Sequence, residues 1–109
     1  MADAVRAVLE DAGWQVETCV NGAEARRKLS SHVHYDLLIF NNQLPGVSGI
    51  ELLRHMRSLP HRRRTPVIVL SASNVEAEAW RAGADAFLRK PNDIQAISNT
   101  VRRLLKVRN

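Results

Sequence analysis

The sequence predicts an α/β fold built on a parallel sheet, and three features of its pattern lead to this prediction. Two continuous apolar runs without alternation, 37–40 and 67–70, are typical of strands that are buried on both faces of a parallel sheet. Segments of about ten residues with helical spacing of apolar residues alternate with the predicted strands. Such alternation indicates β-α-β units with right-handed crossovers. With 109 residues, we expect one domain over 1–109.

The first half of the chain supplies two helices and two strands. Gly13 ends the first helix, because glycine accepts the left-handed conformation that often follows a helix. Asn21 and Glu24 form a capping-box pattern, which starts the second helix. Alternating apolar and polar residues between these signals predict a strand near a sheet edge. The predicted elements are a helix over 3–12, a strand over 14–20, a helix from 21 to about 32 and a strand over 37–41.

The second half continues this pattern with three helices and two strands. Ser48 with Glu51 and Ser73 with Glu76 are two further capping boxes, each at the start of a predicted helix. The last helix is amphipathic. The predicted elements are a helix over 48–58, a polar loop over 59–66, a strand over 67–70, a helix from 73 to about 82, a strand over 85–88 and a helix over 93–107.

The chain is basic, with a net charge of +5 and a pI near 10.3. Such an excess suits nucleic acid or acidic protein partners. However, the basic residues are dispersed, and many fall in the last turns of predicted helices, where cations complement the helix dipole. We interpret them as solvated faces, with a small nucleic-acid-binding protein as an alternative. They are Arg26–Lys28, Arg54, Arg57, the loop run Arg62–Arg64, Arg102, Arg103, Lys106 and Arg108.

The composition also bears on compartment. No apolar run approaches the ~18 residues of a membrane span. The first residues lack the basic and apolar regions of an export signal. Cys19 is the single cysteine and cannot form an internal disulfide, which fits a reducing compartment. We therefore expect a cytoplasmic protein without a membrane segment, in which Cys19 is a small buried strand residue.

Histidines and tryptophans are the remaining candidates for special roles. The spacing of the histidines is not typical of zinc sites, and we interpret them as surface residues; they are His32, His34, His55 and His61. Trp14 is expected in the core. For Trp80 we favour packing of its helix against the core, with an exposed interface anchor as the alternative.

Several spaced motifs resemble the receiver domain of bacterial two-component response regulators. They cover nearly the whole chain in the family's order, which makes the resemblance specific. The motifs are Leu9–Val16, Tyr35–Leu38, Leu44–Gly49, Thr65–Ala72, Ala82–Asp85 and Phe87–Pro91. The resemblance implies a flavodoxin-like fold with strand order 2-1-3-4-5 and helices on both faces. It also implies a role in two-component signalling or a phosphorelay, with a histidine kinase or an output domain as partner.

The family's chemistry depends on an aspartate that accepts a phosphoryl group, two acids that hold Mg²⁺, a hydroxyl and a lysine. Ser71 matches the hydroxyl and Lys90 matches the lysine, while Phe87 matches the aromatic residue that moves with that hydroxyl. Asn41 falls on the phosphoacceptor position. Because an amide lacks the nucleophilic oxygen of a carboxylate, the resemblance implies a degenerate receiver.

The start of the chain departs further from the family. Met1 and Ala2 stand where the family has its acidic pair, so we expect the first strand and both acids to be missing. Asp3 is interpreted as a helix cap and not as a metal ligand. We therefore expect no cofactor, loss of Mg²⁺ binding and no enzymatic activity. An N-terminally truncated receiver of a longer regulator or of a hybrid histidine kinase is the alternative.

The expected loss of a central strand leaves unpaired sheet edges at 16–20 and 37–40, and such edges recruit other chains. Three outcomes stay open: the two strands pair with each other, a partner chain supplies the pairing, or the sequence is a truncated version. We favour a homodimer.

Lys90 has no predicted carboxylate partner, so burial should lower its pKa. We expect Lys90 to turn toward solvent or to donate a hydrogen bond to Asn41 or to backbone carbonyls. By the same resemblance, the peptide bond between Lys90 and Pro91 is a candidate cis peptide. The leading hypothesis is a phosphorylation-independent module that acts through protein–protein interaction.

Overall fold

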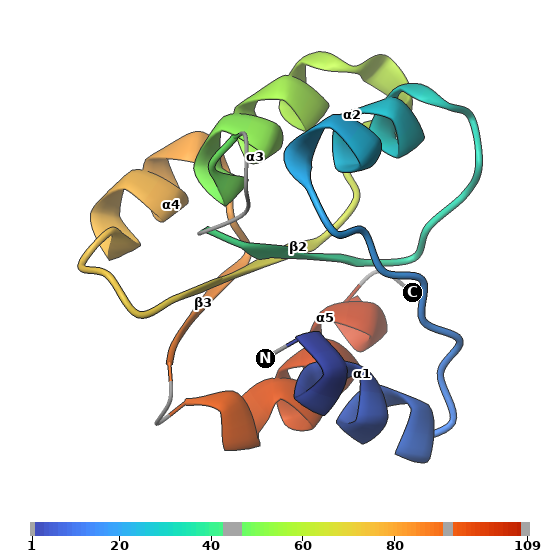
Figure 1. The fold of residues 1–109 in the computed structure, drawn as a ribbon, viewed down its shortest axis with the longest axis vertical. Coiled ribbons are helices and arrows are strands. Elements are labelled where there is room, and N and C mark those ends of the chain that lie inside the picture. The colour runs from blue at the N-terminus through green and yellow to red at the C-terminus, as the bar shows by residue number, and fades with distance from the viewer. Residues whose placement is uncertain (1, 43–46, 91–92, 108–109) are drawn as a thin grey trace.

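The computed structural model describes residues 2–42, 47–90 and 93–107, which form three layers (Figure 1). The middle layer is a parallel sheet of three described strands in the order β1-β2-β3. Helices α2, α3 and α4 cover one face, and α1 and α5 cover the other. The elements are α1 (Ala2–Asp11), α2 (Gly22–Ser30), β1 (Leu38–Asn41), α3 (Gly49–Ser58), β2 (Val67–Ser71), α4 (Glu76–Ala82), β3 (Ala86–Arg89) and α5 (Ile97–Val107). The predicted fold class is confirmed.

Local capping signals position α2 and α3 as the sequence predicts. The Asn21 side chain accepts a hydrogen bond from the Glu24 N–H at 2.9 Å, and Ser48 Oγ accepts one from the Glu51 N–H at 3.1 Å. Each bond satisfies an N–H of the first helical turn that has no partner within the helix. Gly13 follows α1 with φ of 101°, which is the left-handed conformation expected there.

The central strand β2 is buried along its whole length and divides the core in two. Val67 and Val69 face α2, α3 and α4, where they join a cluster that includes Leu53 and Met56. The alternate residues of β2 face the other helical layer. The second cluster consists of Val5, Leu9, Ile68, Leu70, Ala86, Leu88, Ile97 and Val101. Burial on both faces explains why the run 67–70 shows no alternation in the sequence.

The predicted strand over 14–20 is wrong, because the structure assigns no strand there. Trp14 and Val16 do pack against the second cluster, whereas Val20 is 73% exposed. A strand needs a neighbour with which to exchange backbone hydrogen bonds, and residues 14–20 do not pair with β1. The proposed closing-up of these two segments is therefore wrong as well. Cys19 is correspondingly half-buried and lies outside any described strand.

Two helix starts differ from the prediction. α4 begins at Glu76 after Val75, because the Ser73 N–H donates to Ser71 Oγ and the Val75 N–H donates to the Ser73 carbonyl, which forms a turn before the helix. The capping role predicted for Ser73 is wrong. The last helix is preceded by a 3₁₀ turn over Ile94–Ala96, so regular α-helix starts at Ile97.

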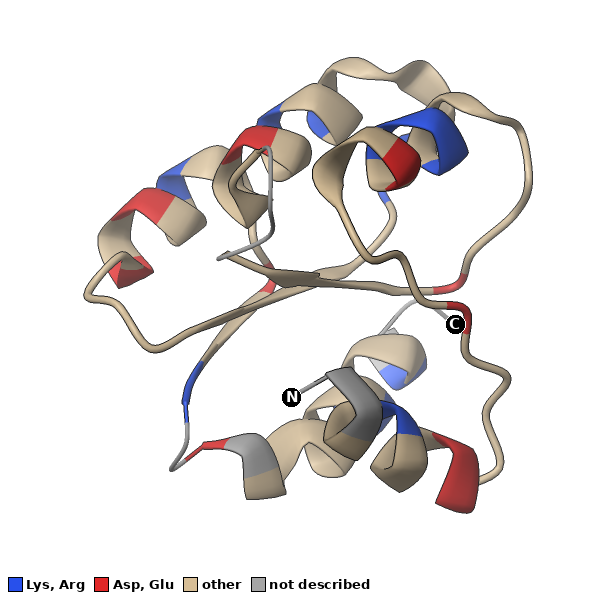
Figure 2. Ribbon diagram, in the orientation of Figure 1, with Lys and Arg blue, Asp and Glu red and all other residues tan. Residues whose placement is uncertain are grey.

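The expectation that the run Arg62–Arg64 is entirely solvated is wrong for its first residue. Arg62 is 2% exposed, at the end of a 3₁₀ turn over Pro60–Arg62. Its guanidinium donates to the carbonyls of Lys28, Leu29 and Ser31 at the end of α2. Figure 2 shows Lys and Arg on several elements of both helical layers.

The favoured packing role of Trp80 is also wrong. Its side chain is 47% exposed on α4, and its indole N–H donates to Glu76 one turn earlier at 3.2 Å. Trp14 is half-buried, and the Arg102 guanidinium lies 5.5 Å from the centre of its ring. His61 contacts the end of α2, where its Nε2–H donates to the Leu29 and Ser31 carbonyls, and its ring stacks on that of His32.

Pro91, the turn over 45–46 and the side chain of Asp3 lie outside what the structure describes, and so do the predictions made for them. None of the described helices has the length and hydropathy needed to cross a bilayer.

Candidate functional site

The candidate site lies at the edge of the sheet where the parallel strands end. Asn41 is the last residue of β1, Ser71 is the last residue of β2, and Lys90 directly follows β3. In the register of the sheet, Asn41 is paired with Leu70, and Ser71 is paired with Arg89. Because parallel strands end on the same side, the three predicted site residues meet at one edge, where α/β sheets bind ligands.

Lys90 and Asn41 are in direct contact. The Lys90 ammonium donates to Asn41 Oδ1 at 2.9 Å, which confirms one of the arrangements expected from the sequence. Both residues are half-buried. Burial lowers the pKa of Lys90 because desolvation disfavours the charged form. The Lys90 ammonium is thus paired with an amide oxygen that carries only a partial negative charge. A carboxylate at position 41 would offer it a full negative charge.

Ser71 is fully buried, and its hydroxyl takes part in the turn that follows β2. Ser71 Oγ accepts a hydrogen bond from the Ser73 N–H at 3.0 Å. The Ser71 carbonyl accepts one from the Lys90 N–H, also at 3.0 Å, so the ends of β2 and β3 are tied together. The structure therefore places Ser71 at the predicted edge and gives its hydroxyl a structural bond.

Phe87 lies on β3, with β2 between it and the strand of Asn41, and it is half-buried against the first core cluster. The Arg89 guanidinium lies 5.9 Å from the centre of the Phe87 ring, and Arg89 also forms an ion pair with Glu76 of α4 at 3.7 Å. These contacts link β3 to the start of α4. They connect the predicted aromatic residue to the exposed Trp80, whose indole shares Glu76 as a partner.

Sequence reasoning missed two residues that shape this edge, Asn42 and Gly49. Asn42 Oδ1 accepts a hydrogen bond from the Ile50 N–H at 3.3 Å, and the Asn42 carbonyl accepts one from the Gly49 N–H at 3.3 Å. A Cβ at Gly49 would lie 3.0 Å from the Asn41 carbonyl oxygen. The first turn of α3 thus packs directly on the backbone of Asn41. The sequence signal that could have identified Asn42 is an amide residue directly after a buried strand.

The resemblance implies Mg²⁺ beside residue 41, and the donor atoms of this edge do not fit such an ion. Mg²⁺ prefers carboxylate oxygens and water in octahedral geometry. Here Asn41 and Asn42 offer neutral amide oxygens, and the Asn41 oxygen already accepts from an ammonium. A divalent cation at that oxygen would also meet the like charge of Lys90. In the described part of the chain, no three His, Cys, Asp or Glu side chains are grouped to hold a metal.

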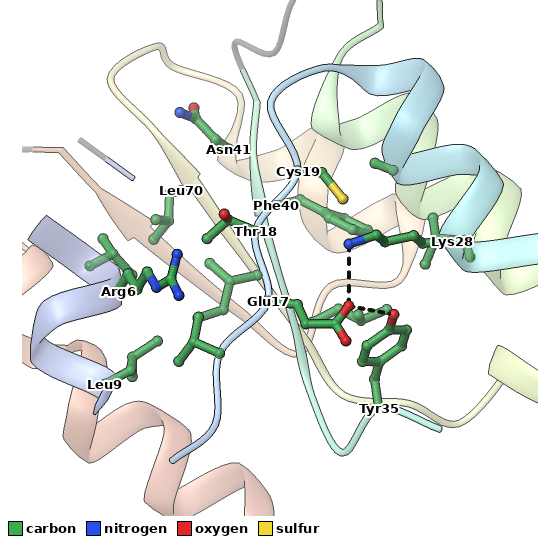
Figure 3. Close-up of a pocket in the computed structure, with 16 residues that line it drawn as sticks. Arg6, Leu9, Glu17, Thr18, Cys19, Lys28, Tyr35, Phe40, Asn41 and Leu70 are labelled. Carbon is green, nitrogen blue, oxygen red and sulfur yellow. Dashed lines mark hydrogen bonds and ion pairs between the residues drawn. The ribbon is translucent and has the colours of Figure 1, made fainter. Parts of the chain in front are cut away.

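A largely apolar pocket of about 240 Å³ extends from Asn41 along the outer edge of β1 (Figure 3). Its walls come from α1, residues 16–19, α2 and β1. On one side Glu17 accepts hydrogen bonds from Tyr35 and from Lys28, at 3.0 and 3.2 Å. The Tyr35 hydroxyl and the Lys28 ammonium lower the pKa of Glu17, and Glu17 in turn raises the pKa of Lys28.

We expect the stability of the protein to depend on pH through Lys90. Its pKa is lower in the folded state than the ~10.4 of an unfolded chain, so the unfolded state binds more protons between these two values. The free energy of unfolding contributed by Lys90 should therefore rise with pH across that window. Lys90→Met removes this contribution. Chemical denaturation of both proteins across the alkaline range measures it.

In that comparison the contribution of Tyr35 to the pH dependence of stability has the opposite sign, because burial and Glu17 raise its pKa. Tyr35 is present in both proteins. Its contribution cancels when the two curves are subtracted. A difference in unfolding free energy that stays flat with pH would contradict the desolvation of Lys90.

The sequence of this chain is similar to those of known proteins. The response regulator receiver domain family matches residues 1–102. The chain is 40% identical over 101 residues to the phosphate regulon transcriptional regulatory protein PhoB of Rhizobium meliloti, an alignment that covers 90% of this chain and 44% of that protein. It is 43% identical over 90 residues to the sensory/regulatory protein RpfC of Xanthomonas campestris pv. campestris, covering 77% of this chain and 12% of RpfC. The chain spans less than half the length of these curated relatives.

Solved structures agree with the sequence relatives. The receiver domain of the Francisella response regulator 1452 has a TM-score of 0.88 and 29% identity, covering 99% of this chain and 89% of that chain. The signal receiver domain of a histidine kinase from Syntrophus aciditrophicus has a TM-score of 0.84 and 34% identity, covering 96% and 81%. The flavodoxin-like fold expected from the resemblance is confirmed by these structures. Sequence and structure together show that the chain belongs to the response regulator receiver domain family.

Proposed function

We propose that this chain is a receiver-like signalling domain that acts through protein–protein interaction and does not depend on phosphorylation. The observation that supports the proposal most directly is the 2.9 Å hydrogen bond from the Lys90 ammonium to Asn41 Oδ1. A receiver that accepts a phosphoryl group needs a nucleophilic carboxylate at this position. The amide of Asn41 is a poor nucleophile, and Lys90 already engages its oxygen.

The same contact bears on switching. A ligand shifts a conformational equilibrium only by its differential affinity for the two states. If no phosphoryl group is added at Asn41, the interactions of such a group cannot shift the equilibrium between two conformations. The bond between Lys90 and Asn41 then holds a single arrangement of this edge, and partners would recognise that arrangement constitutively. Loss of Mg²⁺ binding is part of this proposal, because the amide oxygens of Asn41 and Asn42 are weak ligands for it.

Incubation of the purified chain with acetyl phosphate and Mg²⁺ tests the proposal. We expect intact-mass spectrometry to show no phosphoryl adduct. We expect none for Asn41→Asp either, because this change restores the nucleophile but not the carboxylates that hold Mg²⁺. The Asn41→Asp variant is then the matched control for the nucleophile alone.

A receiver domain with its phosphoacceptor aspartate and acidic pair, treated in parallel, establishes that the donor is active. Stoichiometric labelling of the unmodified chain would refute the proposal. Labelling of Asn41→Asp alone would instead show that the site can bind Mg²⁺, and would limit the defect to the nucleophile.

The relatives suggest partner classes. One is named a transcriptional regulatory protein and another a sensory/regulatory protein, so a histidine kinase or an output domain is the partner we propose. Four further expectations stay predictions. They are a single domain over 1–109, a cytoplasmic location, a role without enzymatic activity and a homodimer. For dimerisation or partner binding, the exposed Trp80 on α4 offers an aromatic anchor.

Nucleic acid binding is the weaker alternative. Electrostatic DNA binding requires basic side chains that are accessible to phosphates. Arg62 is instead buried against carbonyls of α2, and Arg57 donates to carbonyls of Arg63, Thr65 and Gly83. The basic excess is thus partly structural, which favours the signalling role.

A further inference from the structure

A second pocket, of about 420 Å³, lies at the end of the sheet opposite to Asn41. Its walls are the segment 32–34, which precedes β1, and the segment 60–65, which precedes β2. Because the strands are parallel, the segments before them meet at the amino edge of the sheet, whereas Asn41 lies at the carboxyl edge. The volume is in the range of small-molecule sites, roughly 300 to 1,000 Å³. The signalling role proposed above does not use this pocket.

Contacts between the two segments hold the pocket in shape. The Arg62 guanidinium donates to the Leu29 and Ser31 carbonyls at the end of α2. The His61 Nε2–H donates to the same two carbonyls, at 3.1 and 2.8 Å. The His61 ring also stacks on that of His32, with 4.5 Å between the ring centres. A site whose walls are fixed before binding loses little conformational entropy when a ligand enters it.

Arg57 of α3 fixes the segment 60–65 by separate contacts. It donates to the Arg63 and Thr65 carbonyls at 2.9 and 2.7 Å, and its own charge is balanced by Asp85 at 3.0 Å. These two carbonyl oxygens are therefore paired with a cation and do not offer unpaired negative charge to an incoming anion.

The charged side chains in the pocket lining are all basic. Among the described residues that form the lining there is no Asp or Glu, and the carboxylate of Asp36 contacts it only through His34, at 2.8 Å. Arg63 and Arg64 are exposed, so a ligand can reach them. Imidazoles add N–H donors in either protonation state. The basic side chains of the lining are His32, His34, His61, Arg62, Arg63 and Arg64.

Arg62 adds a charge to the pocket that the protein balances only in part. Its guanidinium is 2% exposed, and its partners in the described part of the chain are three backbone carbonyls and the Tyr35 ring, with no carboxylate among them. The end of a helix carries about half an elementary negative charge, so roughly half of the Arg62 charge is left. Because a buried charge is screened less than an exposed one, it makes the pocket attractive to anions.

We infer that this pocket binds a small organic phosphate that carries two or more negative charges, such as a diphosphate. Guanidinium groups match phosphate oxygens in bidentate geometry, so Arg63 and Arg64 would donate to the phosphoryl groups. Val33, which is 52% exposed, and Pro60 offer apolar contact to the organic part. A long polyanion such as DNA suits the molecule less, because it needs basic residues gathered on one face, and Figure 2 shows Lys and Arg on both helical layers.

Isothermal titration of the full chain with ADP, pyrophosphate and adenosine tests this site. EDTA in the buffer excludes metal–phosphate complexes, and salt at about 0.15 M screens charges more than about 8 Å apart. We expect one saturable site for ADP and for pyrophosphate, with ADP bound at least about threefold more tightly, and no binding of adenosine. In NMR spectra, the amide signals of 32–34 and 61–65 should shift on addition of ADP, and those around Asn41 should not.

Two variants and a matched control measure the contribution of the arginines. Arg63→Gln combined with Arg64→Gln should weaken ADP binding at least about tenfold, and Arg63→Gln alone about threefold. The control, Arg26→Gln with Arg27→Gln, removes the same charge from exposed positions of α2 outside the pocket lining. It should weaken ADP binding less than about twofold. Thermal midpoints show that each variant is folded, and the single variant carries the test if the double variant is not.

Four results would each overturn the inference. They are no saturable binding of ADP up to about 5 mM, an equal loss of affinity in the control and in the arginine variants, binding of adenosine as tight as that of ADP, and amide shifts confined to the edge around Asn41. Tighter binding of duplex DNA that the same arginine variants abolish would assign the pocket to nucleic acid instead. Equal affinities for ADP and pyrophosphate would overturn the role of Val33 and Pro60. Acetyl phosphate labelling concerns the other edge of the sheet, so the proposed function and this inference can fail separately.

Discussion

Replacing Arg62 by methionine should lower the free energy of unfolding by about 2 to 3 kcal/mol. The guanidinium donates at 3.0 Å to the Leu29 carbonyl, at 3.2 Å to that of Lys28 and at 2.9 Å to that of Ser31. These carbonyls belong to the last turn of α2 and to its C-cap residue Ser31, where carbonyls have no partner in the regular helical pattern and a cation complements the dipole. Methionine keeps much of the volume but leaves the carbonyls without their charged donor. Urea denaturation measures the loss.

Two features set the size of this effect. His61 also contacts the carbonyls of Leu29 and Ser31, which retains part of the pairing in the variant. Arg62 additionally lies 5.0 Å from the centre of the Tyr35 ring, a cation–π contact that methionine cannot make. The matched control is Arg63→Met at the neighbouring exposed position, which should change stability by less than about 0.5 kcal/mol. Equal losses from both variants would contradict a specific role for Arg62.

Replacing Arg57 by methionine should be similarly costly, by about 2 to 3 kcal/mol. Its side chain is 19% exposed and connects the end of α3 to the segments that precede β2 and β3. It donates at 2.7 Å to each of the carbonyls of Thr65 and Gly83, and it pairs with Asp85 at 3.0 Å. The Asp85 carboxylate also accepts from the Val67 N–H, so the contact holds the starts of β2 and β3 together.

The control for Arg57 is Arg54→Met, one turn earlier on α3 and exposed. It removes the same charge from the same helix, so it separates the loss of net charge from the loss of the contacts. We expect a change within about 0.5 kcal/mol for this variant. A thermal midpoint that falls equally in both variants would show that Arg57 acts only through overall charge. For a chain of this size, the difference in midpoint should be about 10 °C.

The elements predicted correctly are those whose signals are local. Asn21 and Ser48 mark their helix starts with a side chain that bonds the same backbone a few residues later. The run 67–70 is apolar at every position, and its strand is buried on both faces. The meeting of Asn41, Ser71 and Lys90 followed from strand ends and from motif order, because parallel strands place their ends on one side.

The errors involve partners that are distant in sequence. Alternation over 14–20 predicts a strand, but a strand forms only where a neighbour offers a ladder, and that information lies outside the segment. Arg62 is charged and sits in a loop, so nothing local indicates that carbonyls about thirty residues earlier will bury it. Trp80 has a large apolar side chain of the kind that often packs in a core, yet at its position on the short α4 it is exposed. Each outcome depends on tertiary packing.

The order β1-β2-β3 in the sheet repeats the order of the strands in the chain, which has a consequence for assembly during synthesis. Each β-α unit that leaves the ribosome can join the edge formed just before it, so the sheet grows in one direction. The apolar side of α1 differs, because Val5 and Leu9 share their cluster with Ile97 and Val101 of α5. That cluster is therefore completed only when almost the whole described chain has been translated.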